Sequence, residues 1–148
     1  MKKYLPFILI LIMVILILGL SFFDSSSSNV PSIKLASIIT KVLHRLGEDG
    51  NSVSTINLIL RKLAHFMEYL VLTILLSIGF LNTVKKQGYA FLFSAITAGF
   101  VSLIDEIFIQ SFSGRNSNLF DIFVDFMGIG AGLIIFAMVL WLNVKSRK

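Results

Sequence analysis

The chain has 148 residues, of which 56% are hydrophobic and 14% are charged, and its mean hydropathy is +0.90. An ordinary soluble domain carries about 25% charged residues, so this composition indicates a membrane protein and excludes a large soluble enzyme domain. The formal charge of +5 could suggest nucleic-acid binding. The basic residues stand at the ends of apolar runs, however, so we expect no nucleic-acid partner and interpret the charge as topology information. The lack of cysteine excludes disulfides, thiolate metal sites and a cysteine nucleophile.

Four apolar segments are long enough to cross a bilayer as helices. The first, Tyr4 to Phe23, has no charged residue and follows two lysines, an arrangement also found in signal peptides. We expect an uncleaved anchor instead, because a signal peptide has an apolar run of about 7–15 residues and an A-x-A-like cleavage site. The other segments, which are each polar at one end, are about Leu63 to Leu81, Tyr89 to Phe112 and Leu119 to Leu142. The prediction is an all-α, polytopic membrane protein with four transmembrane helices.

The distribution of lysine and arginine favours both chain termini on the cytoplasmic side. With that orientation, seven basic residues flank the spans inside the cell and three flank them outside. The inner set is Lys2, Lys3, Lys85, Lys86, Lys145, Arg147 and Lys148, and the outer set is Arg61, Lys62 and Arg115. The expected localisation is therefore the cell membrane, as a multi-pass protein with both termini cytoplasmic.

The segment between the first two spans is expected outside the cell. It starts with a Ser-rich linker, after which Pro31 is suited to the first turn of a helix. From Ile33 to Leu46 apolar residues recur at helical spacing and the cations are displaced from that stripe, which predicts an amphipathic helix. This helix either lies in the outer membrane interface or packs as a lid on the bundle. Ser54 is the expected cap of the helix that continues into the second span. The single domain thus divides into an anchor (1–23), an outer segment (24–60) and a three-helix core (61–148).

The last three spans carry polar groups where lipid should exclude them. In the predicted orientation all of these groups gather at the outer membrane face: His65 and Glu68, then Asp105, Glu106 and Gln110, then Asp121 and Asp125. The uncharged runs that remain cover about 20–26 Å of a hydrocarbon core about 30 Å thick, so the polar groups begin up to about 10 Å below the headgroups. We therefore predict a polar pit open to the outer side. Each charge at the bilayer centre costs about 2.5–3.5 kcal/mol, so pairing, water, a shared proton or a bound cation is expected there.

Helical spacing predicts which side chains of the second and third spans share a face. Arg61, His65 and Glu68 fall on one side of a helix, because offsets of three and four residues return to nearly the same direction. Asp105 and Glu106 are adjacent and diverge by about 100° in an α-helix, so they do not easily share one partner. These two acids could also simply end the third helix near water.

In the fourth span, Asp121 and Asp125 form a stripe with Gly128 and Gly132. The glycines would allow a neighbouring backbone to approach closely, so the aspartates are expected to face the bundle interior rather than lipid. An alternative for Asp121 is an N-terminal helix acid that the macrodipole favours.

The sequence offers little support for a metal or a nucleophile. His65 and Glu68 resemble half of a metal-binding bundle motif, but a second matching motif is missing, so we expect no transition metal and no cofactor. A magnesium or calcium ion held by oxygen atoms stays open. Ser102, Ser111 and Ser113 are near the pit, and none of them belongs to a recognisable nucleophile motif.

Two stretches, RKLAHFMEYLVLTILL and SLIDEIFIQSFSGRNSNLFDIFVDFMGIGAG, resemble the VanZ-like family of small bacterial membrane proteins. The family pattern has a K-x-x-H-F-x-E-Y element, a D-E-x-x-Q-type element, a G-R turn and a D-x-x-x-D/N-x-x-G stretch. These polar positions fall on Lys62, His65, Glu68, Asp105, Glu106, Gln110, Arg115, Asp121, Asp125 and Gly128. One departure is visible, because Gln110 follows Glu106 by four residues where a shorter spacing is expected. The resemblance implies a link to glycopeptide resistance, specifically low-level resistance to teicoplanin.

The leading functional hypothesis is that the pit binds or modifies an envelope amphiphile, such as a lipid-linked cell-wall precursor or a lipoglycopeptide. The candidate catalytic residues are His65, Glu68, Asp105, Glu106 and Asp125. The candidate binding residues are Arg61, Lys62, Gln110, Arg115 and Asp121. In a catalytic version His65 or Glu68 would be the general base, the other acids would position a cation or share a proton, and Arg115 would hold a phosphate. In a binding version only the charge and shape of the pit matter, and Arg115 could merely anchor to lipid phosphate.

The alternative class is a structural or regulatory membrane protein whose polar cluster only fixes helix packing. Proton-coupled transport is disfavoured, because the polar groups stop well short of the cytoplasmic half of the spans. The expected partners are membrane lipids in every case.

Overall fold

The computed structural model describes residues 4–22, 25–45, 52–84, 86–109 and 119–145. All of the regular structure in these ranges is helical. The elements are α1 (Leu5–Phe22), α2 (Ser25–Arg45), α3 (Val53–Val84), α4 (Gln87–Leu103), the π-helix η1 (Ile104–Ile109) and α6 (Leu119–Lys145). Three stretches are long and apolar enough to cross a membrane, namely Val53–Val84, Gln87–Ile107 and Leu119–Asn143. The chain is therefore an all-helical protein of the membrane type that the composition indicated.

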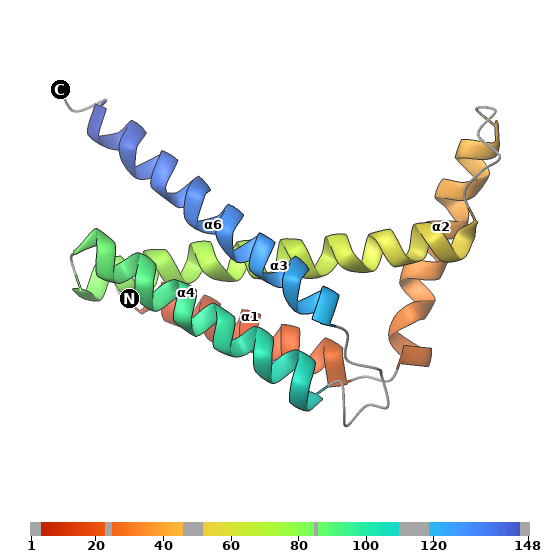
Figure 1. Cartoon of the computed structure of the whole chain (residues 1–148), viewed down its shortest axis with the longest axis horizontal. Helices are drawn as coiled ribbons and strands as arrows, with labels where there is room; N and C mark the ends of the chain where they lie inside the picture. The colour runs from red at the N-terminus through yellow and green to blue at the C-terminus, as the bar shows by residue number, and fades with distance from the viewer. Residues whose placement is uncertain (1–3, 23–24, 46–51, 85, 110–118, 146–148) are drawn as a thin grey trace.

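Four of the helices, α1, α3, α4 and α6, run in alternating directions (Figure 1). The start of α1, the end of α3, the start of α4 and the end of α6 are all on the left of Figure 1, where α6 diverges from the other helices. Helix α3 is central, because it packs against α6, α4, α2 and α1. The core consists of Ile17, Tyr69, Leu72, Leu76, Ala98, Val101 and Ile129. The outer faces of the helices are also apolar, with Ile96 59% and Ile134 57% exposed, as expected for surfaces that face lipid.

Helix α1 is a packed part of this bundle. Its apolar stretch, Leu5–Ser21, is shorter than the three candidate spans. Ile17 is nevertheless buried in the core, and a Cβ on Gly79 of α3 would lie 3.0 Å from Ile10 Cδ1. Because Gly79 has no side chain, α1 packs directly against the backbone of α3 at this position.

Helix α2 starts earlier than predicted. It begins at Ser25, so the Ser-rich stretch predicted as a linker is helical and Pro31 lies inside the helix rather than in its first turn. Serine has only moderately lower helix propensity than alanine. Proline inside a helix costs about 3 kcal/mol, because it removes a backbone hydrogen bond and crowds the carbonyl four residues earlier, so the packing of α2 on α3 has to offset this cost. Ala36 is completely buried, whereas Leu35 and Ile38 are exposed. One side of α2 thus packs on α3 and another apolar side stays open.

The start of α3 is capped by a different serine from the predicted Ser54. The Ser52 hydroxyl accepts a hydrogen bond from the Thr55 backbone N–H at 3.3 Å. The Ser52 carbonyl also accepts one from the Ile56 backbone N–H at 3.2 Å. Ser52 therefore takes the cap position because it stands just before Val53, the first helical residue.

The third predicted span does not continue as a single α-helix over 89–112. It is α-helical to Leu103 and then widens into the π-helix η1. A π-turn holds more residues than an α-turn, so adjacent residues diverge by less than the 100° assumed from the sequence. Asp105 and Glu106, which belong to this π-helix, are both completely buried.

Candidate functional site

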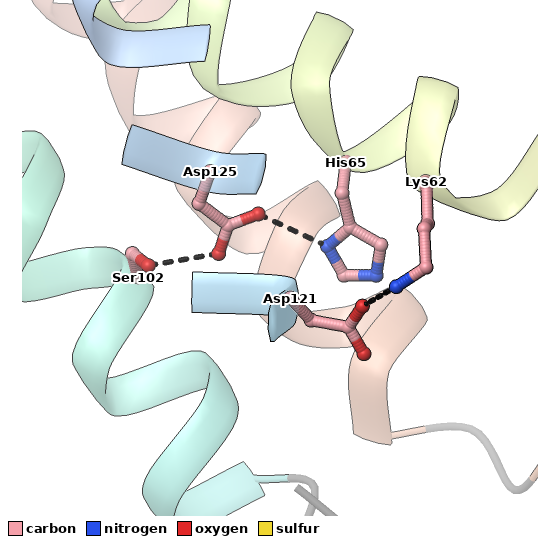
Figure 2. Close-up of polar contacts among 5 residues, drawn as sticks. All are labelled: Lys62, His65, Ser102, Asp121 and Asp125. Carbon is pink, nitrogen blue, oxygen red and sulfur yellow. Dashed lines mark hydrogen bonds and ion pairs between the residues drawn. The ribbon is translucent and has the colours of Figure 1, made fainter. Parts of the chain in front are cut away.

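Polar side chains from four elements lie where α4 ends and α6 begins, at the end of the bundle opposite the start of α1 (Figure 1). Figure 2 shows those of α3, α4 and α6 that make polar contacts with one another. The contributing residues are Lys62, His65 and Glu68 of α3, Ser102 of α4, Asp105 and Glu106 of η1, and Asp121 and Asp125 of α6. Three of the acids, Asp105, Glu106 and Asp125, have no exposed surface. We call this group the polar cluster.

Asp125 is the centre of the polar cluster. The Ser102 hydroxyl donates a hydrogen bond of 2.8 Å to Asp125 Oδ2. The other carboxylate oxygen, Oδ1, lies 3.5 Å from Nδ1 of His65. Figure 2 shows the carboxylate of Asp125 between Ser102 on one side and His65 on the other. This one side chain therefore joins α6 to α4 and to α3.

One turn before Asp125, Asp121 forms an ion pair and hydrogen bond with Lys62 of α3 (Figure 2). The Lys62 ammonium also lies 4.4 Å from the centroid of the Phe120 ring. Both charged side chains are mostly shielded, with 23% of Lys62 and 17% of Asp121 exposed. Asp121 is in the first turn of α6, so the helix dipole adds to the stabilisation that Lys62 provides.

The acids surround His65. One donor atom from each of His65, Glu106 and Asp125 lies within 4.8 Å of the other two. Glu68 follows His65 by three residues on the same face of α3, and Asp105, next to Glu106 in η1, is also completely buried. Carboxyl groups from α3, η1 and α6 therefore lie around the imidazole of His65.

The glycine stripe of α6 allows this assembly, as the sequence predicted. A Cβ on Gly128 would collide with the Phe66 carbonyl oxygen, and a Cβ on Gly132 would lie 2.8 Å from the Leu70 carbonyl oxygen. Real Cβ atoms do not approach backbone that closely, so only glycine permits this spacing of α6 and α3. The short interhelical distance brings Asp125 within reach of His65.

Of the other residues predicted for the site, only Arg61 is among the described residues. Arg61 is half-buried on α3 next to Lys62. Gln110 and Arg115, as well as Ser111 and Ser113, lie outside the described residues. The predicted binding roles of Gln110 and Arg115 therefore stay predictions.

Two buried polar residues at the site were not predicted as members. From the sequence, Ser102 was expected near the pit and was considered only as a nucleophile. In the structure its hydroxyl donates a hydrogen bond to Asp125. Tyr69 was counted in an apolar run, yet it is completely buried and its hydroxyl has no hydrogen-bond partner among the described residues. Its position four residues after His65 was the available signal, because that spacing shares a helix face. Thr73, a further four residues on, instead donates to the Tyr69 carbonyl at 2.7 Å.

A second polar feature lies between α2 and the start of α3. It is a cavity of about 380 Å³. The lining residues are Ser37, Thr40, Lys41, His44, Arg45 and Val53. Lys41 and Arg45 supply basic groups and Ser37 and Thr40 supply hydroxyls. Groups of these kinds suit a bound anion.

The polar cluster has the groups for proton transfer or cation binding. Imidazole and carboxylate can exchange protons with a ligand, and the same atoms are ligands for divalent metals. Ser102 is completely buried and already donates to Asp125, so it positions that carboxylate.

Comparison with family models identifies a match. A family model described as VanZ/LLP1 matches residues 7–141, which is nearly the whole chain. No curated protein matches the chain, and no solved structure matches it either. The matched range includes α1 from its third residue onward, all of α2 and every residue of the polar cluster.

Proposed function

This chain belongs to the VanZ/LLP1 family, and on that premise we propose that it is a four-span bacterial membrane protein that binds or modifies an envelope amphiphile at the polar cluster. The observation that carries the proposal is the burial of Asp105, Glu106 and Asp125 beside His65 in an otherwise apolar bundle. Ionisable groups in membrane helices are costly and mark functional sites more often than not.

The depth of the polar cluster matches a lipid headgroup region. At the opposite end of the bundle, Lys86 lies 5.8 Å from the Tyr89 ring centroid and Lys145 lies 5.3 Å from that of Trp141. Such aromatic and basic pairs mark a membrane interface. Glu106 follows Tyr89 by about 17 residues, which at about 1.5 Å per residue is about 25 Å. The hydrocarbon core is about 30 Å thick, so the acids lie just inside the other interface.

We propose that both termini are cytoplasmic, which would put this second interface outside the cell. The end with Lys86 and Lys145 carries the basic residues that favour the cytoplasm. The polar cluster then faces outward, where lipid-linked cell-wall precursors and lipoglycopeptides are found.

Helix α1 is the proposed fourth span. Its 18 residues extend about 27 Å, close to the thickness of the hydrocarbon core. Its packing on α3 through Ile17 and Gly79 is that of a bundle member.

Helix α2 would then lie at the outer interface, where Leu35 and Ile38 contact acyl chains and the cavity beside Lys41 and Arg45 accepts an anionic headgroup. Together with Lys62, these cations give an anionic amphiphile a charged path toward the polar cluster. A link to teicoplanin resistance would follow if this amphiphile is a precursor or the lipoglycopeptide itself.

A structural or regulatory role is the second candidate. The ion pair between Lys62 and Asp121 joins α3 to α6, and the bond from Ser102 to Asp125 joins α4 to α6. Contacts of this kind would fix helix packing without any ligand.

Mass spectrometry of co-purified lipids separates the two candidates. The wild type, Asp125→Asn, Lys62→Met and the distant control Ser94→Ala would be purified in the same mild detergent. Ser94 is buried in α4 and donates only to the Ala90 carbonyl, so its loss leaves the polar cluster intact. The proposal expects an amphiphile that is retained by the wild type and by Ser94→Ala but depleted in the two cluster variants.

Teicoplanin susceptibility at matched expression tests the link to resistance. His65, Glu68, Glu106 and Asp125 would be substituted singly in a susceptible bacterial host. Unchanged susceptibility in all four variants, together with equal lipid content, would leave only the structural role.

A further inference from the structure

We propose that His65, Glu106 and Asp125 bind one divalent metal ion of the Zn²⁺ or Mn²⁺ type. The three residues come from α3, η1 and α6, and one donor atom of each lies within 4.8 Å of the other two. Glu106 and Asp125 are completely buried, and 13% of the His65 side chain is exposed. The donors therefore converge inside the bundle and not on a solvated acidic surface.

The separation of two of these donors fits a metal better than a direct contact. His65 Nδ1 and Asp125 Oδ1 are 3.5 Å apart. A charge-assisted hydrogen bond between nitrogen and oxygen is about 2.7–2.9 Å long. Two ligands on a tetrahedral ion, each bound at about 2.0–2.1 Å, are instead about 3.4 Å apart. Neither of these two atoms makes a hydrogen bond within the described part of the chain.

The other oxygen of Asp125 is held as a metal-binding carboxylate requires. The Ser102 hydroxyl donates to Oδ2 at 2.8 Å and leaves Oδ1 directed at His65 (Figure 2). Hydrogen bonds to the far atom of a ligand orient it and are a regular feature of metal sites.

An independent observation beside these donors points to a missing ligand. Tyr69 has no exposed surface, and its hydroxyl finds no hydrogen-bond partner in the described residues. Tyr69 follows His65 by four residues in α3, so it lies on the same helix face as the imidazole. A buried hydroxyl without a partner costs about 1–3 kcal/mol, which a water or anion bound to the metal would offset.

The charge of the site suits a dication. A neutral imidazole and two carboxylates carry two negative charges, which a single divalent ion balances in a medium of low dielectric constant. Lys62 of α3 does not balance these two charges, because its ammonium already pairs with Asp121.

The donor set selects the type of ion. Calcium and magnesium take oxygen ligands only, whereas zinc and manganese also accept imidazole. Three protein ligands leave a fourth position for water or substrate, as in zinc sites that act on ligands. The sequence argued against a transition metal because His65 and Glu68 have no second matching motif. The structure uses a different trio, which converges only when three separate elements pack together.

Metal content of the purified protein tests the proposal independently of any amphiphile. The full chain would be prepared without a polyhistidine tag, stripped with a chelator, and desalted after one equivalent of Zn²⁺ or Mn²⁺. We expect about one ion per chain by mass spectrometry. We also expect His65→Gln and Asp125→Asn to lower the retained metal at least about tenfold. His44→Gln is the matched control, because the chain has two histidines and His44 lies on α2.

X-ray absorption of the zinc-loaded wild type keeps the test valid if a cluster variant fails to fold. We expect the spectrum to show one imidazole among oxygen donors at about 2.0–2.1 Å from the zinc. If the same imidazole signal is present in His44→Gln, the ligand is His65. Failure to retain either ion would overturn the site, as would loss of the imidazole signal in His44→Gln or binding of only Ca²⁺ or Mg²⁺. Lipid co-purification with no bound metal would refute this inference and leave the proposed function standing.

Discussion

Replacing Gly128 by alanine is expected to destabilise the protein, while the same change at Gly130 is not. Both residues are within α6 and differ by two positions. The Cβ of an alanine at 128 would collide with the Phe66 carbonyl oxygen and would lie 3.3 Å from the Leu70 backbone nitrogen. At Gly130 nothing lies within 4 Å of the new atom. Comparing the two variants therefore separates the effect of the interhelical contact from the effect of helix propensity.

The magnitude follows from two opposing effects. Alanine is better than glycine in a helix interior by about 0.8–1 kcal/mol, and this gain applies at both positions. Overpacking costs about 1–3 kcal/mol. The upper part of that range applies at Gly128, because its neighbours are backbone atoms that cannot rotate away. We expect Gly128→Ala to lose about 1–2 kcal/mol and Gly130→Ala to gain up to about 1 kcal/mol.

Unfolding in mild detergent, followed by circular dichroism during heating or SDS titration, measures both effects. Fluorescence of Trp141, the single tryptophan, reports the same transition from α6. Equal stability of the two variants, or a more stable Gly128→Ala, would show that close packing of α6 on α3 does not hold the site together.

Three further substitutions test the polar contacts. Lys62→Met should lower stability by about 1–3 kcal/mol, because it leaves the shielded Asp121 without its ion pair; in a double-mutant cycle Asp121→Asn should restore part of the loss, and additive losses would contradict the pairing. Ser102→Ala should cost about 1–3 kcal/mol in detergent unfolding, because the Asp125 carboxylate loses a buried hydrogen bond; a cost near zero would mean that this bond is not formed. In metal-free protein, Tyr69→Phe should leave stability unchanged or raise it by up to about 1–3 kcal/mol, since it removes a buried hydroxyl that has no partner in the described structure, and a loss of stability would reveal a partner.

The sequence by itself determined the class of the protein and the identity of most polar residues at the site. Apolar stretches of helical length are sufficient to predict membrane helices, because a lipid environment leaves a chain few other ways to satisfy its backbone. The spacing of Gly128 after Asp125 predicted the close approach of two backbones, since only glycine leaves that space. Local spacing could predict these features because each depends on a single helix.

Tertiary structure decided which polar atoms face one another. The sequence grouped His65 with Glu68, which share a helix face, but the structure directs His65 toward Asp125 and Glu106 from two other elements. The change from α-helix to π-helix at Ile104 was not predicted either, and the adjacent acids Asp105 and Glu106 within it are both completely buried. Such contacts depend on the relative rotation and distance of separate helices, which no periodicity within one helix encodes.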